Sequence, residues 1–369
     1  MASLRSAGIP LFRFKGIQVF VHWTFFLLVA WVLFTALGEG HDLAEAAFQV
    51  GLVLTVFTCV VLHEFGHALT ALHFGVRTRD ITLLPIGGVA SLERMPEEPR
   101  QELLITLAGP AVNLALVVLL GVPFWLYLGT LGLPDPTAGP PTWLAFVGFL
   151  IGANMVLFLF NLIPAFPMDG GRILRSLLCL RMDRVKATRI ATTVGRVLAV
   201  GFVGYAVMEG QFMWGLIGVF VYFGAQAEYR HVVMQQALKG LHVRNVLRTR
   251  FWSMPHTATL QQATAELLSG AEHHVLVLRE GVPEKLITRA QLLTAAQELP
   301  PDTPLTNVDA VLPPVVHPEA DVRAVHELLL TGNWPLLPVV ERGSLVGVVD
   351  ADNIAEYLVV NGLLRTGQA

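Results

Sequence analysis

Six long apolar segments limit this chain to folds that place them in a lipid bilayer or in a very large core. They lie at residues 17–37, 46–70, 103–128, 142–166, 188–207 and 212–228, and a helix needs about 20 such residues to cross a bilayer. Apolar residues make up 54% of the 369 residues and charged residues 14%, whereas soluble domains contain about 25% charged residues. We therefore predict a multi-pass helical membrane protein.

The composition also excludes other classes. The net charge of −3 provides no basic field for nucleic acid. Two cysteines, Cys59 and Cys179, both lie in apolar surroundings, which excludes a disulfide framework and a cysteine-rich metal site. The first segment is too long for a signal peptide and lacks a small-residue cleavage site.

Positive charges occur in alternate connections between the segments. The connections 38–45 and 129–141 and the one around Glu209 have no Lys or Arg. The Lys and Arg residues of the other connections are Arg5, Arg13 and Lys15 before the first segment, Arg77, Arg79, Arg94 and Arg100 after the second, and Arg172, Arg175, Arg181, Arg184, Lys186 and Arg189 after the fourth. Because Lys and Arg collect on the cytoplasmic side, both termini are expected in the cytoplasm.

The second apolar segment contains His63, Glu64 and His67 in the order HEFGH. A spacing of four places both imidazoles on one helix face, so that both can reach one ion. Glu64 lies about 100° round the helix and can hold a water there without being a ligand. The motif alone also occurs by chance, but ionisable groups inside a membrane helix are costly and usually functional. We therefore predict a metal site.

A zinc hydrolase needs a third protein ligand, and Asp169 is the carboxylate that topology places at a similar depth to His67. It follows the fourth segment in NLIPAFPMDGGR. Pro164 and Pro167 should end the helix, and Gly170-Gly171 should permit a turn that other residues resist. The alternative is a plain helix stop with a solvated aspartate.

Together these residues resemble the site-2 protease family of intramembrane zinc metalloproteases. HEFGH and NLIPAFPMDGG carry the resemblance, and IQVFVHWTF at the start of the membrane domain is similar as well. The resemblance implies one zinc ion held by His63, His67 and Asp169, with Glu64 as the catalytic acid and base. It also implies that Asn161 helps to hold the substrate carbonyl or oxyanion. Asn113, in AGPAVN, matches a recurrent motif, with packing as an equal alternative.

Residues 81–93, ITLLPIGGVASLE, alternate in polarity around Gly87 and Gly88 and resemble the membrane-associated β-region of that family. Its edge is expected to pair with an unwound substrate, as in strand addition. The alternative is an ordinary cytoplasmic hairpin. Cys59 could approach the metal, but a buried thiol is the favoured interpretation. His22 could serve the site or make a local hydrogen bond.

The tail contains an internal repeat. Residues 255–291 align without a gap on 317–353, so that Ala258 meets Ala320 and Gly281 meets Gly343. Each copy is predicted as helix, strand, glycine turn, strand, helix, and two such units make one compact domain. The expected domains are a membrane domain at 1–230, a linker at 231–243 and a tail at 244–369, with copies at 244–300 and 304–364.

The tail resembles a tandem pair of CBS domains. Such pairs often bind adenine nucleotides through a Thr or Ser followed three residues later by an Asp. Here Thr288 is followed by Gln291, and Asp350 by Asn353, so that nucleotide binding at Thr288 and its absence are both open. Dimerisation through the CBS domains or control of substrate access is possible without it.

The predicted fold class is a polytopic α-helical membrane domain of about six spans, with a small membrane-associated β-region, followed by a soluble α/β tandem CBS domain. The predicted function is that of a zinc metalloprotease in the plasma membrane of a prokaryote, with its N-terminus and CBS domain in the cytoplasm. It would hydrolyse a peptide bond within or next to a transmembrane segment of membrane-bound regulatory proteins, and the CBS pair could gate it. The alternative is a CBS-regulated transporter or channel with a structural metal site.

Overall fold

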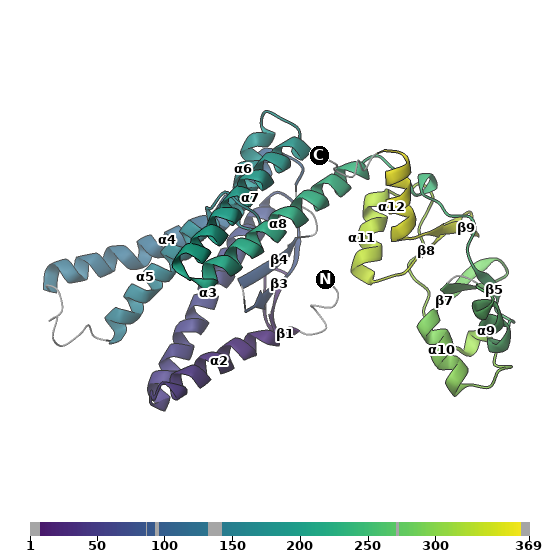
Figure 1. Cartoon of the computed structure of the whole chain (residues 1–369), viewed down its shortest axis with the longest axis horizontal. Coiled ribbons are helices and arrows are strands. Elements are labelled where there is room, and N and C mark those ends of the chain that lie inside the picture. Colours follow the sequence, from purple (N-terminus) through teal and green to yellow (C-terminus); the bar gives the residue numbers. More distant parts are fainter. Residues whose placement is uncertain (1–7, 86, 93–95, 132–141, 271–272, 363–369) are drawn as a thin grey trace. The chain divides into compact units, whose positions relative to one another are not determined.

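The computed structural model describes residues 8–85, 87–92, 96–131, 142–270 and 273–362 (Figure 1). The chain divides into two compact units, with the boundary between Val232 and Val233. Each unit is described by itself. Arg5 and Arg94, the connection 132–141 and the last two residues of the second predicted copy lie outside the described residues.

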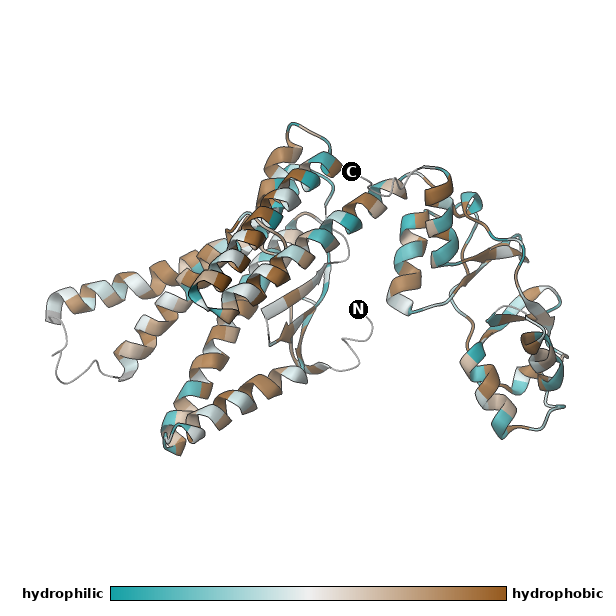
Figure 2. Cartoon of the chain, viewed as in Figure 1, coloured by the Kyte–Doolittle hydropathy of each residue, from teal (hydrophilic) through white to brown (hydrophobic). Residues whose placement is uncertain are grey.

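Helices make up most of the first unit. They are α2 (Thr24–Gly38), α3 (Leu43–His73), α4 (Pro99–Leu131), α5 (Thr142–Asn161), α6 (Asp169–Cys179), α7 (Arg184–Glu209) and α8 (Phe212–Ala237), of which the residues of α8 after Val232 count to the second unit. Among the described residues, α3, α4, α5 and α7 are long and apolar enough to cross a membrane. Figure 2 shows apolar residues recurring along α3, α4 and α5. The predicted helical membrane domain is thus confirmed, with fewer long spans than expected.

The first and the sixth predicted spans differ from the prediction. Residues Ile17–His22 form a strand, so the apolar helix that follows, α2, has only 15 residues. Alternate residues of this strand are buried, which shows that its apolar character serves a sheet. Helix α8 has 26 residues, but from Gln226 onward polar and charged residues alternate with short apolar stretches. It is therefore not among the four long apolar helices.

A four-stranded sheet accompanies the helices. Its strands are β1 (Gly8–Phe14), β2 (Ile17–His22), β3 (Thr78–Leu84) and β4 (Gly87–Leu92), in the order β1-β2-β3-β4. Strands β2 and β3 are parallel, and the other two pairs are antiparallel. The structure therefore confirms the β-region predicted at 81–93 as a hairpin, and it places β4 at one edge of the sheet.

Helix α3 packs on this sheet and on α4. One of its faces, with Val61, Phe65 and Ala68, packs into a core formed with the β2 and β3 side chains. His63 and His67 follow at positions that the 100° helical step turns to the opposite side of α3. The two-sided pattern of α3 therefore gives one face to the sheet and the other to α4.

The chain between α5 and α6 breaks as the prolines predict, since α5 ends at Asn161 and α6 begins at Asp169. The predicted glycine turn is wrong, however. Gly170 and Gly171 belong to the first turn of α6, where a Cβ on Gly171 would lie 2.7 Å from the backbone of Ala165. These glycines are needed because α6 packs directly on the preceding segment.

The second unit consists of two similar copies, as predicted. The first contains η1 (Val243–Asn245), β5 (Ser253–Pro255), α9 (Leu260–Leu268), β6 (His274–Arg279), β7 (Val282–Thr288) and α10 (Arg289–Glu298). The second contains η2 (Leu305–Asn307), α11 (Val322–Gly332), β8 (Leu337–Glu341), β9 (Ser344–Val349) and α12 (Ala351–Val360). The hairpin turns have positive φ at Gly281 and Gly343, which explains the aligned glycines.

The short 3-10 segment of each copy packs into the core of the other copy. Val243 and Val246, in and just after η1, are buried in the core of the second copy. Their counterparts, Leu305 and Val308, are buried in the core of the first. Because each core is completed by residues from the beginning of the other copy, the pair is expected to fold as one domain.

Candidate metal centre

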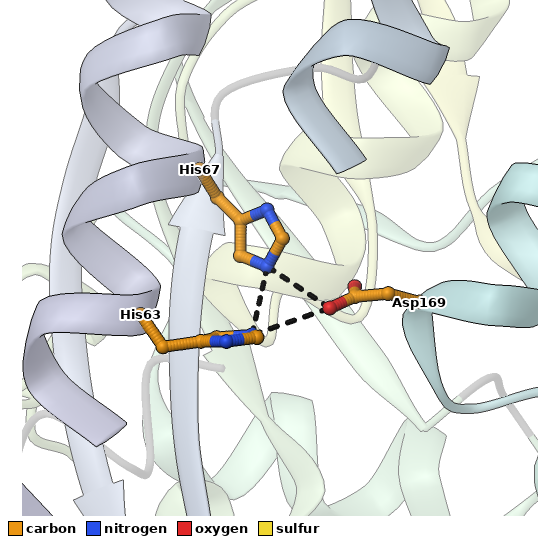
Figure 3. Close-up of side chains that lie close together, drawn as sticks. All are labelled: His63, His67 and Asp169. Atoms are coloured by element: carbon orange, nitrogen blue, oxygen red, sulfur yellow. Dashed lines mark hydrogen bonds and ion pairs between the residues drawn. The ribbon is translucent and has the colours of Figure 1, made fainter. Parts of the chain in front are cut away.

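Three ligand-type side chains from two helices meet in the first unit (Figure 3). His63 and His67 project from α3, and Asp169 reaches them from the first residue of α6. The two Nε2 atoms are 3.0 Å apart, and Oδ2 of Asp169 lies 3.2 Å from each. All three residues are buried, with at most 8% of their surface exposed. The structure thus brings together the three residues predicted as ligands.

The other nitrogen of each imidazole faces an oxygen. Nδ1 of His67 lies 2.8 Å from the carbonyl oxygen of Ile105, and Nδ1 of His63 lies 2.5 Å from Oδ1 of Asn113. An imidazole that donates from Nδ1 has its free lone pair on Nε2. Both free lone pairs then face the carboxylate of Asp169, and Asn113 orients the ring of His63 in addition to packing.

This donor set fits a cation such as zinc. Oδ2 of Asp169 is buried and accepts no hydrogen bond from the described residues, although it lies beside two nitrogen lone pairs. Three electron-rich atoms this close repel one another unless a positive charge lies between them. Ligand atoms of a tetrahedral zinc site with bonds of about 2.0–2.1 Å lie about 3.3 Å apart, close to the distances found here.

Two glycines allow the helices to approach at this point. A Cβ on Gly66 of α3 would lie 2.6 Å from the carbonyl oxygen of Ala108 in α4. A Cβ on Gly109 of α4 would lie 2.7 Å from Nε2 of His63 and closer still to the ring of His67. Any side chain on Gly109 would therefore occupy the space in which the ligand atoms meet.

Glu64 lies next to the ligand cluster but is not part of it. It follows His63 on α3 and is half-buried. It lies against Gly88 of β4, where a Cβ would be 2.7 Å from Cγ of Glu64. The absence of a side chain on Gly88 therefore lets the edge strand lie directly against the predicted catalytic carboxylate, with Gly87 beginning the same strand.

The remaining candidates are used locally. The amide of Asn161 donates to the carbonyl oxygen of Leu157 in its own helix, at 2.9 Å. Cys59 is buried as a free thiol outside the ligand cluster, in agreement with the favoured interpretation. His22 pairs with the hydroxyl of Thr24 at 2.7 Å, which is the local hydrogen bond considered above.

Sequence reasoning treated Arg175 as a cytoplasmic loop charge, and the structure corrects this. Arg175 lies in α6 with only 1% of its surface exposed, and it forms ion pairs with Glu102 of α4 and Glu228 of α8. Arg184 also pairs with Glu102, at 3.0 Å. Because a buried charge needs charged partners, the network ties the helix that carries Asp169 directly to α4 and α8, and through Glu102 to α7. Its members are far apart in the sequence, so no local pattern indicates it.

Comparison with known proteins supports the same interpretation. The model of peptidase family M50 matches residues 51–129 and 136–202, and a CBS domain model matches residues 310–360. A zinc metalloprotease of Methanocaldococcus jannaschii is 35% identical over 241 residues, which cover 65% of this chain and 66% of that protein. The protein Rip3 of Mycobacterium tuberculosis is 28% identical over 385 residues, which cover 97% of this chain and 94% of Rip3.

One solved structure is also similar to this chain. The site-2 protease from Methanocaldococcus jannaschii is 35% identical, with a TM-score of 0.45, over 60% of this chain and 95% of that one. The family matches decide against the transporter or channel alternative. The chain belongs to peptidase family M50, the site-2 proteases, and combines its zinc metalloprotease domain with a C-terminal CBS domain.

Proposed function

We propose that this chain hydrolyses a peptide bond within or next to a transmembrane segment of membrane-bound regulatory proteins. The observation that carries the proposal is the meeting of His63, His67 and Asp169 beside Glu64, with the two histidines on a 31-residue apolar helix. Two nitrogens and one carboxylate oxygen form the donor set of zinc hydrolases, which leaves a fourth position for water or substrate. A site on such a helix acts on substrates that share the bilayer.

In this proposal, His63, His67 and Asp169 hold one zinc ion per chain. When bound, zinc supplies Lewis acidity to the carbonyl under attack and makes water easier to deprotonate. Glu64 accepts a proton from the attacking water at its carboxylate and then delivers a proton to the leaving amine. Its half-buried position beside the ligands suits this role, because the carboxylate can reach water on one side and the ligand cluster on the other.

Asn161 is proposed to hold the substrate carbonyl or the oxyanion. Its side-chain amide donates to the carbonyl oxygen of Leu157, one turn earlier in α5. That carbonyl is also the ordinary acceptor for the backbone of Asn161 itself, so that the side chain can leave it at little cost. We therefore expect Asn161 to turn toward the substrate when one is bound.

The substrate is proposed to pair as a strand with the free edge of β4, near Gly87 and Gly88. Helical backbone must unwind before its peptide bonds become accessible, and unwound backbone in a membrane needs new hydrogen-bond partners. An edge strand supplies them, and Gly88 places this edge against Glu64. A paired substrate would then pass the catalytic carboxylate.

Photo-crosslinking tests the edge pairing. Val89 of β4 is 37% exposed, and Leu11 of β1, at the opposite edge of the same sheet, is 55% exposed. A photoreactive residue placed at each position in the Glu64→Gln background should capture a single-span substrate from position 89. Equal capture from position 11, or capture from that position only, would rule out pairing on β4.

Reconstitution in liposomes tests the reaction itself. The protein is mixed with a single-span substrate, and the products are mapped by mass spectrometry. We expect a cut within the span or a few residues from it, and no cut in the same peptide without its span. Cuts confined to soluble segments of the substrate would contradict the proposal.

The second unit is proposed to lie in the cytoplasm of a prokaryotic cell, together with the N-terminus, because the positive connections face that side. It would control access to the protease, and a homodimer through the CBS domains is one route. Thr288 caps α10 and donates a hydrogen bond from its hydroxyl to the side chain of Gln291.

Protease digestion of inside-out and right-side-out vesicles tests the proposed cytoplasmic placement of the second unit, since only inside-out vesicles should lose it.

A further inference from the structure

A second amide, Asn154 of α5, lies directly behind Asn113. It is fully buried in a helix that is otherwise almost entirely apolar, and the sequence motifs do not include it. Its Oδ1 accepts from Nδ2 of Asn113 at 3.0 Å, and its own Nδ2 donates to the carbonyl oxygen of Leu150 at 2.9 Å. Nδ2 of Asn154 also faces the sulfur of Cys59 at 3.3 Å. A buried amide is costly unless both of its ends are paired, and here both are.

These contacts have only one consistent direction. A backbone carbonyl can only accept, so the atom of Asn154 that faces Leu150 must be its NH2 group. The oxygen of Asn154 must then face Asn113, which in turn presents its NH2 group to Asn154 and its oxygen to His63. Nδ1 of His63 must therefore carry the proton, and its Nε2 must carry the free lone pair.

The two histidines reach this state in different ways. The acceptor for His67 is the backbone carbonyl of Ile105, which cannot exchange its roles. The acceptor for His63 is a side-chain amide, which could flip and present its NH2 group instead. After a flip, His63 would accept at Nδ1 and carry a proton on Nε2, and that proton would point at the other two ligands.

We propose that Asn154 is a positioning residue that fixes the tautomer of His63 by preventing Asn113 from flipping. The inference rests on the proposed metal site and adds a determinant of its affinity. Asn154 itself contacts neither substrate nor metal, because it acts on His63 only through Asn113.

Zinc affinity of the full-length protein in detergent, measured by competition with a chelator, tests the inference. Asn154→Leu removes the acceptor that orients Asn113, and we expect zinc binding to weaken about 10- to 100-fold, as for other partners behind metal ligands. Asn154→Asp should stay within about threefold of wild type, because an acid buried in apolar surroundings stays protonated and can both accept and donate. Cys59→Ala should also stay close to wild type, since Leu150 still fixes the direction.

A spectroscopic readout separates positioning from a merely structural role. Nitrogen chemical shifts of histidine-labelled, metal-free protein report which nitrogen of His63 carries the proton. The Nδ1-protonated form should prevail in wild type and in Asn154→Asp, and a mixture is expected in Asn154→Leu. If Asn154→Leu does not fold, Asn154→Ala removes the same acceptor without adding bulk and takes its place.

The outcomes distinguish two failures. Zinc binding by wild type with unchanged affinity and tautomer in the folded Leu or Ala variant would overturn the role of Asn154 alone. Absence of zinc from wild type would overturn the proposed function, and the inference with it.

Discussion

Gly109→Ala should disable the metal centre with a single methyl group. The new Cβ would lie 2.7 Å from Nε2 of His63, whereas ordinary contact begins at 3.4 Å, so that the ring or the helix must move by about 0.7 Å. Metal–ligand distances in real sites vary by only about 0.2 Å. A shift of this size therefore takes His63 out of reach of an ion that the other ligands hold.

The expected loss follows from the cost of overpacking. Extra methyl groups in a tight interior cost about 1–3 kcal/mol, which corresponds to roughly 5- to 150-fold in zinc affinity. Because the ring of His67 lies even closer to the new methyl group, the upper part of this range is expected. Zinc content and chelator competition measure the effect, and cleavage of a single-span substrate should decline with it.

Gly121→Ala provides a matched control in the same helix. A Cβ at Gly121 meets nothing within 4 Å, and alanine favours the helix by about 1 kcal/mol over glycine. Wild-type zinc binding is expected for this variant. The reasoning would be refuted if Gly109→Ala bound zinc as tightly as Gly121→Ala, since the ligand atoms would then not meet where Gly109 leaves space.

Three further predictions concern parts of the chain away from the ligands. Arg175→Met should destabilise the first unit by about 3–5 kcal/mol, because it leaves the buried carboxylate of Glu102 without its main partner; thermal unfolding in detergent measures this. Titration of the full chain with AMP or ATP at millimolar concentration should give no binding heat, because Gln291 and Asn353 donate their amides to backbone carbonyls in both copies. Burial raises the pKa of Asp321, but hydrogen bonds and charge from Arg323 lower it more, so that the net pKa lies below its usual value. Asp321 also caps α11, so Asp321→Ala should cost about 0.5–2 kcal/mol at pH 7. A carboxylate whose pKa is lower in the folded than in the unfolded protein stabilises the fold above its unfolded pKa of about 3.9, and this stabilisation is lost as the pH falls. Urea unfolding should therefore show a smaller stability difference between wild type and Asp321→Ala near pH 3 than at pH 7.

Each of these predictions can be contradicted by a definite result. A loss below about 1 kcal/mol in Arg175→Met would mean that Glu102 is satisfied by Arg184 alone. Saturable heat with AMP would show that the amides at 291 and 353 do not exclude the nucleotide. An effect of Asp321→Ala that grows on acidification would mean that the carboxylate is not stabilised in the folded tail.

Much of the metal centre could be predicted because most of its residues occur in short sequence motifs. His63 and His67 are one helical turn apart, so their shared face follows from helix geometry alone. The prediction of Asp169 also needed the membrane topology, because the alternation of positive charges among the connections places Asp169 at a depth similar to that of His67. The tail repeat was equally readable, because glycines with positive φ recur at the same place in both copies.

The parts that sequence reasoning missed depend on contacts between distant segments. Asn154 lies 41 residues after Asn113, and nothing in its own helix marks it except its polarity among apolar neighbours. Arg175 looks like a loop charge until α4 and α8 are packed around it. Hydropathy predicts the start of a span at Ile17–His22, where the structure has a strand, because apolar alternation in a short segment cannot be separated from a helical run by hydropathy alone.

The most direct test of the central claim compares wild type with Glu64→Gln for zinc content and cleavage. Both proteins are purified in detergent, and zinc is measured alongside cleavage of a single-span substrate. Because Glu64 lies beside the ligands without being one of them, we predict about one zinc ion in each protein, with cleavage by wild type only. Absence of zinc from carefully handled wild type, or undiminished cleavage by Glu64→Gln, would contradict the account.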